Sequence, residues 1–221
     1  MVLIEHNFRS KFYKLNYFPS LPLNMSNWIP MVPESSFFSG SSISARFTVS
    51  NLSSSEEEQE VRVLERFRGG LINNSPAMFC GGPVSAMAWC PMDKGDQVIA
   101  VVAKLDFSPT SLGEDGGGKG LIQFWRMGGL ELEGGGEPPV FQFGIGHSYG
   151  CVRGVEWCPS LGREEGRLGL LAAACGDGSV RVWAIPCLNS IQDEGMIYEK
   201  EADMSLVLGE EVVEQCMALS W

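Results

Sequence analysis

The sequence has no long apolar run and few histidines. No segment of the 221 residues approaches the roughly 20 apolar residues that a membrane-spanning helix needs. The opening Met-Val-Leu-Ile stretch is too short for the apolar core of a signal peptide. With 2 histidines, no Ser-His-Asp or Cys-His catalytic constellation can be argued. We expect a soluble protein, not an exported one, with no catalytic residues, no membrane contact and no small-molecule substrate.

Paired cysteines are missing as well. The chain has 7 cysteines, an odd number, and no Cys-x-x-Cys pair. This argues against a disulfide framework and against a zinc ribbon, so we expect reduced thiols in the nucleus or cytosol. The Asn-x-Ser strings at Asn24, Asn51 and Asn73 are then chance matches to the glycosylation signal.

Positive charge is scarce in the second part of the chain. The net charge is −11, and from Gly81 onward 9 Lys and Arg face 20 Asp and Glu, whereas the first 80 residues hold 7 of each. An acidic surface repels phosphate, which counts against direct capture of DNA by this chain. The charge of the chain therefore favours a protein partner over DNA.

Glycine and proline are plentiful, with 27 and 12 residues that lie mostly between short apolar runs. This arrangement favours an all-β fold of short strands joined by turns. Residues 1–78 carry no sustained period and include the acidic run SSSEEEQE, so we expect a poorly ordered, low-complexity arm there. Within it, EVRVLERF has both helical and strand spacing and stays undecided.

Residues 79–221 contain a repeat that is centred on tryptophan. VSAMAWCP ends at Pro91, VRGVEWCP ends at Pro159, and CMALSW ends at Trp221. A second phrase follows the first two copies, VIAVVA with GLIQFW and then GLLAAAC with GSVRVW. We expect Trp89 and Trp157 to have matching surroundings in equivalent sheets.

The repeated phrases predict small antiparallel sheets that must stack. In SVRVW, Val180 and Val182 face one side, and Arg181 and Trp183 face the other. Leu121, Gln123 and Trp125 share a side in the first copy. A sheet of three or four short strands cannot bury both apolar faces alone, so each copy needs a neighbour of its kind.

Radial stacking of such sheets is the β-propeller. GDGSVRVW at 176–183, with Gly146-His147 upstream, resembles a WD repeat. The resemblance implies that His147, Asp177 and Trp183 join a hydrogen-bonded network that holds the sheet together. Ala184 stands where the name-giving Asp would be, and the first copy has Lys119 at the position of the turn Asp and no equivalent His. We expect the first copy to be held by packing alone.

The stretch GEDGGGKGLIQFW at 113–125 contains G-x-x-x-x-G-K, the outline of a phosphate-binding loop. Such a loop needs Ser or Thr after the Lys and a helix behind it. Here Gly120 follows Lys119, and LIQFW has strand character. We expect an enlarged turn between two strands and no nucleotide, cofactor or enzymatic activity.

A metal site built from the histidine and cysteine residues is not supported by their spacing. His147, Cys151 and Cys158 have the spacing H-x3-C-x6-C, which matches no common site. Paired acids such as Glu164 and Glu165 are most often solvated. The residues to which we assign a role are therefore structural, namely Trp89, Trp125, His147, Trp157, Asp177 and Trp183.

A narrower resemblance combines FCGGPVSAMAWCP, GLIQFW after a Gly-rich insertion, GCVRGVEWCP and RLGLLAAACGDGSVRVW. Together these are similar to the WD-repeat (beta) subunits of general transcription factor IIIC (TFIIIC), over residues 79 to 186. The resemblance implies a nuclear, non-enzymatic scaffold in RNA polymerase III transcription, bound to other TFIIIC subunits and to promoter DNA only through the complex. An interaction module of another multiprotein complex is the alternative. Two repeats and the first strand of a third also indicate an incomplete propeller.

Overall fold

The computed structural model describes residues 21–31, 44–50, 59–72, 75–92, 97–104, 118–128, 137–159, 166–191, 193–207 and 219–221. Within these ranges the chain is all-β, with strands β1 to β14 and two 3₁₀ helices of 3 residues, η1 (Met25–Asn27) and η3 (Leu188–Ser190). No helix in this part of the chain is long and apolar enough to cross a membrane. The expected fold class is confirmed at the level of all-β structure in several sheets.

The first sheet has the order β1-β13-β9-β8-β7-β6. Its centre is an antiparallel meander of β6 (Val84–Trp89), β7 (Val98–Ala103), β8 (Gly120–Arg126) and β9 (Val140–His147). Two strands distant in sequence extend it, because β13 (Met196–Glu199) pairs parallel to β9 and β1 (Ile29–Pro30) pairs antiparallel to β13. Every residue of β7 is buried, as expected for an unbroken apolar run in the interior of a sheet.

The second sheet has the order β10-β11-β12-β14. It is antiparallel throughout, and β10 (Gly154–Trp157), β11 (Arg167–Ala174) and β12 (Val180–Pro186) follow one another in the chain, whereas β14 (Met204–Leu206) joins β12 after β13 has entered the first sheet. Val180 and Val182 pack on one face of this sheet, and Trp183 belongs to the core on the other face. The predicted alternation of SVRVW is therefore confirmed.

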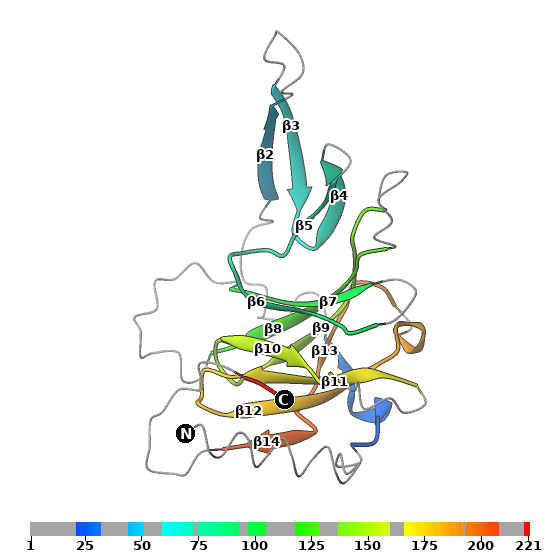
Figure 1. The fold of residues 1–221 in the computed structure, drawn as a ribbon, viewed down its shortest axis with the longest axis vertical. Coiled ribbons are helices and arrows are strands. Elements are labelled where there is room, and N and C mark those ends of the chain that lie inside the picture. The colour runs from blue at the N-terminus through cyan, green and yellow to red at the C-terminus, as the bar shows by residue number, and fades with distance from the viewer. Residues whose placement is uncertain are drawn as a thin grey trace.

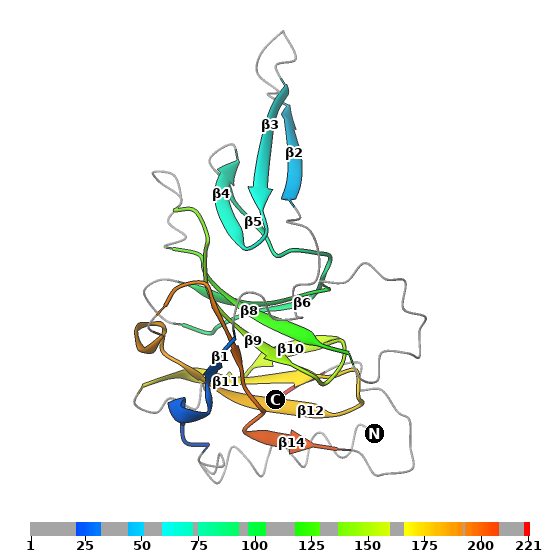
Figure 2. The same ribbon diagram turned by 180° about the vertical axis from the view of Figure 1, so that it is seen from behind.

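The two sheets are stacked face to face, as Figures 1 and 2 show from opposite sides. The main core lies between them and is built from Val98, Phe124, Phe143 and Ile145 of the first sheet and Leu171, Ala173, Trp183 and Ile185 of the second. The rings of Phe124 and Phe143 stack with centroids 4.5 Å apart. Each copy of the repeat thus buries an apolar face against the other copy, which is the arrangement that the sequence predicts.

Two hairpins lie among the described residues of the N-terminal arm. They are β2 (Ser44–Ser50) with β3 (Gln59–Glu65) and β4 (Arg68–Ile72) with β5 (Ser75–Phe79). The undecided stretch EVRVLERF is strand β3 followed by a turn, in which Phe67 has a positive φ of 61°. Propensity and spacing alone could not decide between helix and strand here, because pairing with β2 selects the strand.

The hairpin β4–β5 lies against the outer face of the first sheet. Phe67, beside this hairpin, stacks on Phe141 with ring centroids 4.9 Å apart, and Met78 packs on the same cluster. Gly69 approaches Pro139 so closely that an added Cβ would lie 2.7 Å from its carbonyl carbon. Part of the arm therefore contributes to the core, although its sequence has no repeat signal.

The third Trp-centred phrase is described only at its end. Cys216 lies outside the described residues, whereas Leu219 and Trp221 pack on the face of the second sheet that points away from the first. Leu21 and Leu23 from the start of the chain join this cluster. The described end of the third phrase therefore packs on the far face of the second sheet.

Candidate protein-interaction site

Trp157 connects the two sheets. Its side chain is 4% exposed, its indole N–H donates to the carbonyl of Ala88 at 3.1 Å, and its ring meets Phe124 edge-on at 6.0 Å between centroids. Trp89 occupies the equivalent place in the first sheet and is 47% exposed. The expectation of matching surroundings for Trp89 and Trp157 is therefore wrong. The Trp157 side chain packs against the first sheet, whereas no sheet of the described chain covers Trp89.

His147, Tyr149 and Trp183 form an aromatic cluster at one end of the interface. The His147 ring lies parallel to Tyr149 at 5.6 Å and is 6.1 Å from Trp183. Arg181 covers Tyr149, with its guanidinium carbon 4.1 Å from the ring centroid. Arg181 also binds Asp177 at 3.0 Å in the turn between β11 and β12. The three residues to which the sequence assigns a shared network thus lie in one region.

Their hydrogen bonds differ from the expected network. Asp177 accepts from the backbone N–H of Ser179 at 2.9 Å and from Arg181. His147 Nδ1 accepts from the backbone N–H of Tyr149 at 3.3 Å, and its buried Nε2 has no partner. Trp183 donates to the carbonyl of Lys200 at 3.2 Å. The cluster is joined by ring packing and by a polar turn, with no direct bond between His147 and Asp177 or Trp183.

Burial sets the charge state of this cluster. Burial lowers the pKa of His147 from 6.5 to about 4, and the nearby Arg181 acts in the same direction while Asp177 opposes it. Burial alone would raise the pKa of Asp177, but the hydrogen bonds from Ser179 and Arg181 outweigh it, so its pKa lies below the usual value. At neutral pH, His147 is an uncharged packing residue beside an ion pair.

Sequence analysis missed Lys200 and Asp203. The Lys200 side chain is 4% exposed and binds Asp203 at 2.6 Å. Asp203 also accepts from the backbone N–H of Ala184 at 2.8 Å. A carboxylate from the link before β14 thus binds the backbone of Ala184, where a WD repeat would have its own Asp. No local pattern could reveal this, because the two residues are 19 positions apart.

The first sheet is not held by packing alone, which corrects that expectation. Trp125 is fully buried and donates to Gln123 Oε1 at 3.1 Å. Gln123 Nε2 in turn donates to the carbonyl of Cys80 at 2.8 Å. This chain of hydrogen bonds anchors the segment before β6 to β8. The predicted common side of Leu121, Gln123 and Trp125 is confirmed by these bonds and by the shared cluster.

The glycine run leads directly into β8, a strand that starts at Gly120. No helix N-terminus stands behind Lys119, which a phosphate-binding loop requires. An added Cβ at Gly120 would lie 2.6 Å from His147 Nε2 and 3.1 Å from the carbonyl oxygen of Gly150. Gly120 is therefore needed to admit the His147 ring, while residues 113–117 lie outside the described part of the chain.

Two of the three candidate metal ligands, His147 and Cys158, lie in different clusters of side chains. Cys158 is fully buried in the cluster on the far face of the second sheet, whereas His147 lies in the cluster with Tyr149. Among the described residues, no group of three or more His, Cys, Asp or Glu side chains could hold a metal ion. Burial raises the pKa of the Cys80 thiol to about 11, so this thiol is not a ready nucleophile.

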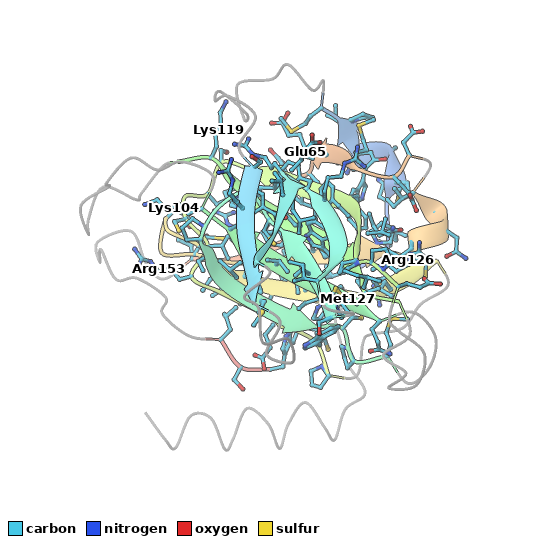
Figure 3. The ribbon with its side chains drawn as sticks, turned by 90° about the horizontal axis from the view of Figure 1, so that it is seen from above. Glu65, Lys104, Lys119, Arg126, Met127 and Arg153 are labelled. Atoms are coloured by element: carbon cyan, nitrogen blue, oxygen red, sulfur yellow. The ribbon has the colours of Figure 1, made fainter. Side chains whose placement is uncertain are left out.

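The two rims of the stacked sheets differ in surface chemistry. Figure 3 shows Lys104, Lys119 and Arg153 on one side of the molecule, and Arg126 and Met127 on the other. On the second side, beside η3, lies a hollow of about 500 Å³, whose wall includes Arg126, Leu188 and Gln142. Gln142 donates to Glu194 at 3.3 Å in this wall.

No family model matches the chain. It is 35% identical over 125 residues to "General transcription factor 3C polypeptide 2" of Homo sapiens and of Pongo abelii, covering 50% of this chain and 14% of each relative. It is 34% identical over 108 residues to "Transcription factor tau subunit sfc6" of Schizosaccharomyces pombe, covering 48% of this chain and 18% of the relative.

The chain is thus similar, over about half of its length, to two proteins named as transcription-factor components. This confirms the resemblance to the transcription factor IIIC family that the Trp-centred phrases suggest. The region shared with this chain is less than a fifth of the length of either relative. The sequence identity alone therefore does not assign the relatives' activity or partners to this chain. The relatives are named as transcription-factor components, and the described part of this chain has an all-β fold.

Proposed function

We propose that this chain is a non-enzymatic, WD-repeat scaffold that acts in the nucleus in RNA polymerase III transcription. In this proposal the two stacked sheets are adjacent blades of a β-propeller within residues 79–221, and other TFIIIC subunits are the partners. The main support for this proposal is the sequence similarity to the human and fission yeast transcription-factor subunits. The two stacked, Trp-centred sheets of this chain agree with it.

The charge distribution supports a contact role in which DNA is engaged indirectly. The net charge is −11, and the buried His147 is uncharged at neutral pH. Direct binding to duplex DNA depends on several Lys or Arg contacts to phosphate. An acidic scaffold would therefore reach promoter DNA through basic subunits of the complex, without base contacts of its own.

Affinity purification tests this function. The full chain, tagged and expressed in cells of its own source, should recover other TFIIIC subunits, as identified by mass spectrometry. Trp157→Ala should reduce that recovery several-fold, because it leaves a cavity between the two sheets. Met25→Ala, at a side chain 36% exposed, is the matched control and should leave recovery unchanged.

The same experiment separates the two candidate settings. Recovery of a different set of subunits, equally sensitive to Trp157→Ala, would support an interaction module of another complex and contradict the TFIIIC assignment. The purified chain alone should not shift promoter DNA in a gel at physiological salt. A shift by the chain alone would overturn the indirect route to DNA.

A further inference from the structure

The core between the two sheets ends differently at its two rims. At one rim the rings of His147, Tyr149 and Trp183 pack together, and His147 and Trp183 are buried. At the other rim lies the hollow of about 500 Å³ beside η3, and none of the described residues that line it has an aromatic ring. Figure 3 separates the two rims, with Lys119 on one side and Arg126 on the other. The second rim therefore has room for a side chain where rings fill the first.

The inner wall of the hollow is apolar and continuous with the main core. Val98 of the first sheet and Leu168 of the second line it and are 0% and 9% exposed. Met92, Leu188 and Ile191 also line it, and each packs against the core cluster. A large apolar side chain that entered here would leave water, which is favourable in proportion to the apolar area buried. The inner wall thus suits a large apolar side chain.

Polar side chains stand beside this apolar wall. Asn189 is exposed in η3, and the buried Gln142 donates to Glu194 at 3.3 Å. An amide side chain offers N–H donors and a carbonyl acceptor, the two kinds of group that pair with an extended main chain. Mostly apolar pockets of this size that contain a few polar groups are typical binding sites. This combination favours a peptide segment over a purely apolar molecule.

Carboxylates dominate the exposed charge around the hollow. Glu194 and Asp193 are exposed neighbours in the chain, and Glu137 is exposed just before β9, at the rim where β8 ends. Arg126 is the cation in the described wall, whereas Arg167 is buried and donates to a backbone carbonyl. An acidic mouth attracts Lys and Arg side chains and repels phosphate and carboxylate groups. Charge therefore favours a basic segment over a nucleic acid or an acidic one.

We propose that this hollow binds an extended segment of a partner subunit, in which one large apolar side chain is flanked by lysine or arginine. The apolar side chain enters between Val98 and Leu168, the main chain bonds to Asn189, and the basic side chains face Glu194 and Asp193. The inference rests on the proposed function for the identity of the partner as a TFIIIC subunit. The chemistry of the hollow selects the segment.

Two neighbouring positions of η3 supply a blocking variant and its control. Asn189 and Ser190 are both exposed, and of the two only Asn189 lines the hollow. Asn189→Trp places a bulky ring at the mouth and should obstruct an incoming side chain. Ser190→Trp adds the same ring outside the hollow. Because both positions are exposed, both variants should keep the unfolding midpoint of the unmodified chain.

A random dodecapeptide display library, selected on the full chain, tests the hollow without any assumption about the partner. The selected peptides should share one Phe, Trp, Leu or Met residue with Lys or Arg close to it. Synthetic copies, measured by fluorescence anisotropy, should bind Asn189→Trp about tenfold or more weakly than the unmodified chain, as for loss of a central anchor, and bind Ser190→Trp equally well. Recovery of no such peptides, or equal binding to all three proteins, would overturn the proposal.

A charge pair keeps the proposal testable if Asn189→Trp does not fold. Glu194→Gln retains an acceptor for Gln142 and should weaken the selected peptides about two- to fivefold at low salt, as for loss of one exposed ion pair. Glu199→Gln makes the same charge change at the far end of β13, opposite Gly146 and near the His147 rim, and should leave binding unchanged. Equal effects of the two substitutions would reduce the binding to non-specific attraction and contradict a site in the hollow.

Affinity purification of the same variants separates this inference from the proposed function. Asn189→Trp should lose at least one TFIIIC subunit that Ser190→Trp retains. Recovery of the same TFIIIC subunits with all three proteins would leave the proposed function in place and overturn this inference. Absence of TFIIIC subunits, together with basic peptides that need the open hollow, would contradict the proposed function and leave the binding site in place.

Discussion

At the scale of single residues, His147 shows how the interior selects a charge state. Its ring lies between Tyr149 and Trp183, and burial holds its pKa near 4. Because Nδ1 accepts from the Tyr149 N–H, a second proton on the ring would have to go to Nδ1 and would break that hydrogen bond, while the buried Nε2 offers no compensating partner. His147 therefore acts through shape and through one accepted hydrogen bond, and protonation opposes folding.

This predicts a specific dependence of stability on pH. The pKa of His147 is lowered from 6.5 to about 4, so the unfolded chain binds the proton first as the pH falls. The free energy of unfolding should drop between pH 6.5 and 4 by up to about 3 kcal/mol, and it should be fully present above pH 6.5. Urea unfolding at a series of pH values measures it. His147→Asn keeps an acceptor for the Tyr149 N–H and should lack this drop, so the same slope in both proteins would refute the assignment.

Gly120 supplies a second residue-scale prediction. Gly120→Ala places a Cβ 2.6 Å from His147 Nε2 and 3.1 Å from the Gly150 carbonyl oxygen, where the ring cannot move away freely. We expect a loss of about 1–3 kcal/mol in the free energy of unfolding, as for other overpacked sites. Gly154→Ala is the control, because nothing lies within 4 Å of its added Cβ. Comparable losses in the two variants, measured by chemical denaturation, would mean that backbone freedom matters here and not the contact with His147.

At the scale of elements, the hairpin β4–β5 is the least expected part of the fold. It comes from a segment with no repeat signal, yet it covers part of the outer face of the first sheet through Phe67 and Met78. Its fit depends on backbone contact, since Gly69 lies against the carbonyl group of Pro139. A glycine is required where two backbones approach this closely.

Gly69→Ala should therefore loosen the hairpin from the sheet. Its Cβ would lie 2.7 Å from the Pro139 carbonyl carbon, whereas the Cβ of Gly70→Ala would meet only the end of the Leu64 side chain at 3.0 Å. We expect hydrogen exchange of the β4 and β5 amides to speed up about tenfold or more in Gly69→Ala, which corresponds to roughly 1.4 kcal/mol or more of lost protection. Gly70→Ala should change little, and amides of β7 should be unaffected in both. Uniform acceleration across the first sheet would show that the hairpin is integral to it.

At the scale of the whole molecule, the two sheets depend on each other. The core between them joins residues from both, and Trp157 from one sheet binds a carbonyl of the other. Residues from distant parts of the described chain take part as well, because Leu21 and Trp221 both pack on the far face of the second sheet. The chain has a net charge of −11, and the contact between the two sheets is apolar, which suits a protein that works by contact.

The sequence by itself determined the two Trp-centred copies, their strands and the faces of SVRVW and LIQFW, because alternation of apolar and polar residues is a local property. It also carried the resemblance to TFIIIC subunits. It did not determine the partners of Trp183 or Ala184, since Lys200 and Asp203 reach them from a later link.

Only the tertiary structure decided which equivalent residues share an environment. Trp89 and Trp157 have the same local pattern, but one is half exposed and the other buried, because burial depends on whether another sheet lies opposite. EVRVLERF forms a strand for a similar reason, because it pairs with β2, a segment that is not adjacent to it in the sequence. A local pattern sets which face of a strand is apolar, and long-range contact sets what that face meets.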